Sequence, residues 1–159
     1  MKVIKWLDNN LEEFLMVMFL ILMIFIMGVQ VFARYFLNYS LSWSEEISRY
    51  LFIWSAFISV SYCTKKCISI KIEHLVAELP VRKKAFAKLV NHTIELIFFV
   101  YILYFSVLYV ISAVKSGQLS PAFRIPMYYV QAAPLVSFIL VIIRIIQRWI
   151  IEFKTMMGV

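Results

Sequence analysis

The sequence contains few of the residues that form loops and few charged residues. Its 159 residues include only 3 glycines and 4 prolines, which leaves little room for long loops or linkers. Hydrophobic residues make up 64% of the chain and charged residues 16%, with a mean hydropathy of +0.87, whereas soluble domains are about half apolar. This composition excludes a soluble domain and predicts an all-α integral membrane protein with a single domain over residues 1–159.

Signals for catalysis or metal binding are also scarce. The chain has 2 cysteines and 2 histidines, too few for a complete set of metal ligands. Cys63 and Cys67 form a C-x-x-x-C that we interpret as free thiols at the membrane boundary. The motifs G-x-x-x-x-G-K-[ST], G-x-S-x-G and H-E-x-x-H do not occur. We therefore expect no enzyme activity, no cofactor and no metal site.

Four apolar stretches are long enough to cross a hydrocarbon layer of about 30 Å, which takes roughly 20 helical residues. We predict spans over residues 11–36, 44–63, 89–115 and 127–149. A cleaved signal peptide is the alternative for the first stretch, but it would have a shorter apolar core and a small-residue cleavage site, whereas this run ends in FARYF. Gly117 suits the end of the third helix, and Pro134 can kink the first half of the fourth.

A short amphipathic segment separates the second and third spans. Ile72, Leu75, Val76 and Leu79 recur at helical spacing and make one apolar face, and Pro80 should end the helix. The segment is too short to span a membrane. We predict an interfacial helix over residues 69–79, with a soluble amphipathic hairpin as the alternative.

The basic residues predict the orientation in the membrane. They lie at the ends of apolar runs and form no single patch with interleaved aromatics, so we expect contacts with membrane lipids and no nucleic acid. The face that holds both termini carries twelve of the 16: Lys2, Lys5, Lys65, Lys66, Lys71, Arg82, Lys83, Lys84, Lys88, Arg144, Arg148 and Lys154. The other face carries Arg34, Arg49, Lys115 and Arg124. By the positive-inside rule both termini are cytoplasmic.

The densest polar cluster lies at the opposite face, where the first two spans meet. Ser42 and Glu45 form an S-x-x-E pattern typical of a helix start. Arg49 lies four residues after Glu45 and three after Glu46, so it can pair with either carboxylate on one helix face. Four small residues of this helix also share a stripe that either packs against another helix or is a chance run: Ser48, Ser55, Ser59 and Cys63.

The third predicted span contains one acidic residue, Glu95, close to Asn91 and His92 and to the basic end of the helix. An acidic residue inside a span is a functional-site hypothesis by default. A carboxylate so near the end of a span favours local pairing over a proton relay. The relay would suit a small four-span, proton-coupled multidrug exporter that acts as a homodimer, which is the alternative function.

Three segments resemble a known family. Residues 30–54, QVFARYFLNYSLSWSEEISRYLFIW, contain QV-x-x-RY followed by L-x-W-x-EE-x-x-RY-x-F-x-W. This pattern resembles the signature of the small membrane subunit of tripartite ATP-independent periplasmic (TRAP) transporters, the DctQ-like family. SPAFRIPMYYVQAAP resembles that family's proline-rich loop, and SIKIEHLVAELPVRKK is similar to its interfacial stretch, although the histidine falls later than usual.

The resemblance implies a function without catalysis. The chain would be a scaffold subunit in the bacterial inner membrane, paired with a large membrane subunit that is a separate polypeptide. That subunit would carry the substrate and sodium sites and move by an elevator-type motion. A periplasmic binding protein would deliver an organic acid, of the sialic acid or C4-dicarboxylate class.

The resemblance and the topology together give candidate contact residues. Arg34 and Arg124 are candidates for contacts with the binding protein, although both can be read as charges that simply reach the membrane interface. Trp43 suits a position at the headgroups and Trp54 a packed position against a helix. Candidates for the large-subunit interface, or for a joint between helices, are Trp43, Glu45, Glu46, Arg49, Trp54, Ser55 and Ser59. The charges among them can equally serve only to cap and orient the helix.

Overall fold

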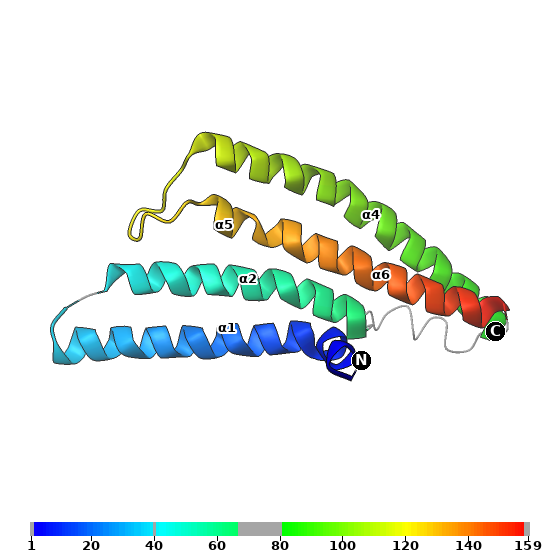
Figure 1. Ribbon diagram of the computed structural model, residues 1–159, viewed down its shortest axis with the longest axis horizontal. Coiled ribbons are helices and arrows are strands. Elements are labelled where there is room, and N and C mark those ends of the chain that lie inside the picture. The colour runs from blue at the N-terminus through cyan, green and yellow to red at the C-terminus, as the bar shows by residue number, and fades with distance from the viewer. Residues whose placement is uncertain (1, 40, 67–80, 158–159) are drawn as a thin grey trace.

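Four long helices lie side by side in a single row in the computed structural model (Figure 1), which describes residues 2–39, 41–66 and 81–157. The long helices are α1 (Lys2–Phe36), α2 (Ser42–Lys66), α4 (Val81–Ser116) and α6 (Ala133–Met157), and a short helix, α5 (Tyr128–Gln131), precedes α6. They pack in the order α1, α2, α6 and α4. The predicted all-α class is confirmed for the described residues.

Within the described residues, three segments are long and apolar enough to cross a membrane: Asn10–Phe36, Phe86–Ser116 and Tyr128–Thr155. α2 is not among them, and its sequence has charges at both ends with several serines between. Both ends of the chain lie at the same end of the row (Figure 1). The fourth span and the direction of insertion stay predictions, and the predicted interfacial helix at 69–79 falls outside the described residues.

Residues with a left-handed backbone end two of the helices. Asn38, with φ 49°, follows α1. The amide of Tyr39 donates to the carbonyl of Ala33, six residues back, over 3.2 Å. Gly117, with φ 60°, follows α4 as the sequence predicts. Asn and Gly both tolerate a left-handed backbone without strong strain.

The sequence predicts a kink at Pro134 within a continuous span, and the structure differs. The helix is interrupted at Ala132, between α5 and α6, and Pro134 is the second residue of α6. A proline in the first turn of a helix removes no bond, because the amides there have no partner within the helix. Its position therefore starts α6 and leaves the rest of that helix regular.

α6 is one of the two inner helices of the row and contacts both α2 and α4. A third (33%) of its apolar segment is buried, against 6% in α1 and 11% in α4. The Ser137 hydroxyl donates to the carbonyl of Phe57 in α2. The ring of Phe138 lies 6.2 Å from that of Phe57 and 5.9 Å from that of Phe99 in α4. These contacts join three helices at mid-height and leave the outer faces of α1 and α4 for lipid or a partner.

The predicted stripe of small residues on α2 does not form the helix contact within this chain. Ser48 is buried, but Cys63 is exposed. The Ser59 hydroxyl donates to the carbonyl of Ala56 in the same helix. The buried serines of α2 are Ser44, Ser48 and Ser61. Only Ser48 belongs to both sets, and packing of the other stripe residues against a partner helix stays a prediction.

Candidate functional site: a joint at each end of the row

The loop between α4 and α5 is a compact hairpin-like turn. Leu119 and Pro126 pair as an isolated antiparallel bridge. The amide of Ser120 donates to the carbonyl of Ile125 over 2.9 Å, and the amide of Met127 donates to that of Gln118 over 2.9 Å. Arg124 lies near its tip with φ 54°, a conformation that costs a non-glycine residue energy and needs support from its surroundings.

Glu46 of α2 supplies that support. Its Oε2 accepts from the amides of Ala122 over 2.9 Å and Phe123 over 3.1 Å, and its Oε1 accepts from the Tyr50 hydroxyl. Only 9% of Glu46 is exposed. The ring of Trp43 contacts that of Phe123 edge to face, with 6.1 Å between centroids. Two helical turns of α2 therefore hold the proline-rich loop by its backbone.

The same end of α2 is tied to α1. The side-chain amide of Gln30, which is buried, donates from Nε2 to Oε1 of Glu45 over 2.8 Å. Glu45 thus binds a neighbouring helix, in addition to its place in the predicted helix-start pattern. No ion pair joins Arg49 to Glu45 or Glu46 among the described residues. We call Gln30, Glu45, Glu46, Tyr50 and the loop 118–127 the loop-side joint.

The structure brings only some of the predicted contact residues into this joint. Glu45 and Glu46 belong to it, and Trp43 contacts its loop through the ring of Phe123. Arg34, in the last turn of α1, and Arg124 and Arg49 are exposed at the same end of the row. Trp54, Ser55 and Ser59 are partly buried farther along α2. Their predicted contacts with partner proteins stay predictions.

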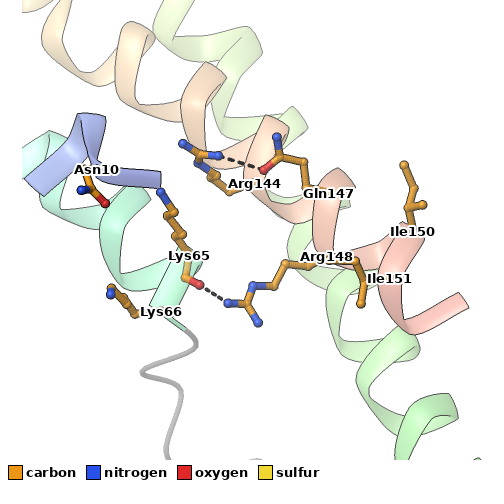
Figure 2. A pocket seen from close by; sticks show the side chains of 8 residues that line it. All are labelled: Asn10, Lys65, Lys66, Arg144, Gln147, Arg148, Ile150 and Ile151. Atoms are coloured by element: carbon orange, nitrogen blue, oxygen red, sulfur yellow. Dashed lines mark hydrogen bonds between the residues drawn. The ribbon is translucent and has the colours of Figure 1, made fainter. Parts of the chain in front are cut away.

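A second joint, at the end of the row that holds the termini, was not foreseen. Glu12 of α1 is completely buried. Its Oε1 accepts from Nε of Arg144 in α6 over 2.6 Å, and its Oε2 pairs with Nζ of Lys65 in α2 over 3.2 Å. Arg148 of α6 also donates to the carbonyl of Lys65. We call Glu12, Lys65, Arg144 and Arg148 the terminus-side joint, and Figure 2 shows Lys65, Arg144 and Arg148.

The sequence analysis counted Arg144 only among the basic residues of the face that holds both termini, whereas the structure leaves just 7% of it exposed. The available signal was Glu12, an acidic residue two positions before the uncharged core of the first predicted span. A charged side chain at the edge of an apolar run needs a group of opposite charge or a hydrogen-bond partner if it is buried. Its partners, Lys65 and Arg144, are 53 and 132 residues away, so spacing alone could not identify them.

Glu95 is locally paired, as the sequence favours. Its two carboxylate oxygens contact Nδ2 of Asn91 at 2.8 Å and Nδ1 of His92 at 3.1 Å. Nearby, Lys88 of α4 pairs with Glu152 of α6 over 3.1 Å. The Glu95 contacts stay within α4, whereas the pair of Lys88 and Glu152 joins α4 to α6 and extends the polar contacts across the last pair of helices.

Comparison with known proteins shows similarity to one protein family. A family profile described as tripartite ATP-independent periplasmic transporters, DctQ component, matches residues 23–155. Over 151 residues the chain is 28% identical to the isethionate TRAP transporter permease protein DctMQ of Oleidesulfovibrio alaskensis, covering 91% of this chain and 24% of that protein. Two Haemophilus influenzae proteins described as TRAP transporter small permease proteins are 35% identical over 89 residues and 27% over 104. Those matches cover 55% and 62% of the two proteins, so the chain spans less than two thirds of the length of each relative.

Proposed function

Because the chain belongs to the DctQ component family of tripartite ATP-independent periplasmic transporters, we propose that it is a non-catalytic scaffold subunit of such a transporter. It would pair with a large membrane subunit that carries the substrate and sodium sites and moves in an elevator-type cycle. A periplasmic binding protein would dock at the loop side. The single observation that carries the scaffold role is the clamping of one helix row at both ends by buried carboxylates.

A static scaffold has to resist the movement of the domain that slides against it. Glu46 fixes the loop to α2, and Glu12 connects α1, α2 and α6, so the helices are held in register at both ends of the row. The exposed apolar faces of the two edge helices are available to a partner subunit or to lipid. This arrangement supports a rigid wall, which is what an elevator-type partner needs.

The proposed setting is the bacterial inner membrane, with four spans and both termini cytoplasmic. α2 would be the fourth span, because its neighbours α1 and α6 are both long and apolar enough to cross. The transported compound would be an organic acid, of the sialic acid or C4-dicarboxylate class. The Oleidesulfovibrio relative, whose name specifies isethionate, is consistent with a broader range of small organic acids.

Co-expression with a large TRAP membrane subunit from the same organism tests this proposal. A tagged copy of this chain should pull down the large subunit in a one-to-one complex that survives size-exclusion chromatography in detergent. A monodisperse homodimer that takes no large subunit and transports cations in a proton gradient would instead support the four-span exporter.

Reversal of the charge at Arg34 tests the docking role. Arg34→Glu should lower binding-protein-dependent uptake about tenfold at low ionic strength and less at high salt, because a rim charge acts mainly on the association rate. Lys115→Glu, at the same end of the row on the edge helix α4, is the matched control and should have a smaller effect. Loss of the one-to-one membrane complex in the Arg34 variant would show that this residue supports assembly.

A further inference from the structure

An open pocket of about 850 Å³ lies at the terminus-side joint. Four cationic side chains from two helices line it, and Figure 2 shows Lys65 and Lys66 at the end of α2 and Arg144 and Arg148 along α6. The pocket lies at one end of the row, where apolar helix segments give way to charged residues. It therefore lies where a phospholipid headgroup would meet the protein.

The described side chains that line the pocket favour an anionic ligand. Glu12 pairs with Arg144 and Lys65 and offsets part of their charge. Arg148 and Lys66 add two more positive charges at the same place. Lys66 is exposed, with its Nζ 5.7 Å from the ring of Tyr62. Clusters of basic side chains at the cytoplasmic end of membrane helices attract anionic headgroups by about 1 kcal/mol for each charge near the surface.

The walls of the pocket are not all polar. Ile150 and Ile151 of α6 also line the pocket and are 46% and 62% exposed. A free inorganic anion gains no binding energy from an apolar wall. An acyl chain does, because lipid tails pack on exposed aliphatic side chains at this depth. Cationic and aliphatic walls in one open pocket fit a molecule with a phosphate at one end and a hydrocarbon chain at the other.

We propose that this pocket binds the phosphate headgroup of an anionic phospholipid, with the phosphate between Lys66 and Arg148 and an acyl chain along Ile150 and Ile151. The site goes beyond the transport role, and it does not require the large subunit or a substrate. A bound lipid would bridge α2 and α6 in parallel with the contact from Arg148 to the backbone of Lys65.

The test uses the full chain, purified in detergent and freed of lipid, with its thermal unfolding midpoint measured against added phosphatidylglycerol, phosphatidylcholine or inorganic phosphate. Phosphatidylglycerol should raise the midpoint in a saturable way, and phosphatidylcholine and inorganic phosphate should not. The double variant Lys66→Gln/Arg148→Gln should need about tenfold more phosphatidylglycerol for the same shift.

Lys154→Gln, an exposed lysine on α6 that does not line the pocket, is the matched control and should titrate like the unmodified chain. If the double variant unfolds, the single change Lys66→Gln at an exposed residue gives the same comparison.

An equal response to inorganic phosphate would show a soluble-anion site and overturn the lipid assignment. Equal responses to the two lipids, or equal titrations of the Lys66 and Lys154 variants, would overturn the site itself. Formation of the one-to-one membrane complex is measured separately, so failure of one proposal leaves the other intact.

Discussion

Replacing Glu12 by alanine is expected to lower the free energy of unfolding by about 3 kcal/mol, the usual cost of removing one partner from a buried ion pair. The carboxylate is completely buried and contacts both Arg144 and Lys65. Its loss would leave two positive side chains near each other without the negative charge that they share. Because the three residues come from α1, α2 and α6, we expect the helix row to loosen at the terminus side.

The measurement is unfolding of the purified chain by heat or by denaturing detergent. Glu13→Ala is a close control, because Glu13 is the next residue of the same helix and is exposed. It should change stability by less than about 0.5 kcal/mol, as surface substitutions usually do. Equal stability of the Glu12 and Glu13 variants would mean that the buried ion pairs do not hold the helices together.

Replacing Glu46 by alanine is expected to free the loop between α4 and α5. The amides of Ala122 and Phe123 would lose the carboxylate that accepts from both, and Arg124 would lose the support for its left-handed backbone. Hydrogen exchange at these two amides should become about tenfold faster or more, because hydrogen bonds to a charged acceptor are among the stronger ones.

Glu45→Ala separates this effect from a general weakening of α2. It removes the neighbouring carboxylate, which bonds Gln30 of α1 and not the loop. The exchange of the loop amides should stay close to that of the unmodified chain, while the contact between α1 and α2 weakens. Equally fast exchange at Ala122 and Phe123 in both variants would argue against a specific hold on the loop by Glu46.

The sequence predicts the large features of this fold because they follow from composition and periodicity. Apolar runs gave three segments that the structure also finds long and apolar enough to cross a membrane, with boundaries within a few residues at the ends near Phe36 and Ser116. Gly117 marks a helix end because only a few residue types favour its backbone conformation. These are local signals, and local signals can be read from one segment at a time.

The two joints could be predicted only in part because each depends on contacts between distant segments. Glu46 was recognised as a candidate, but its partners at Ala122 and Phe123 are backbone amides, which any residue except proline provides. Glu12 was overlooked because Glu13 follows it at the edge of the same apolar run, and nothing in that segment shows which of the two carboxylates is buried. Its burial depends on α6 crossing beside α1 and α2, which no pattern within α1 indicates.

Reconstitution into liposomes tests the scaffold proposal most directly. Vesicles would contain this chain alone, the large membrane subunit alone, or both, with the binding protein, organic acid and a sodium gradient supplied outside. The proposal predicts uptake only when both membrane subunits are present, and none by this chain in either a sodium or a proton gradient. Transport by this chain alone, or full uptake by the large subunit without it, would contradict the proposal.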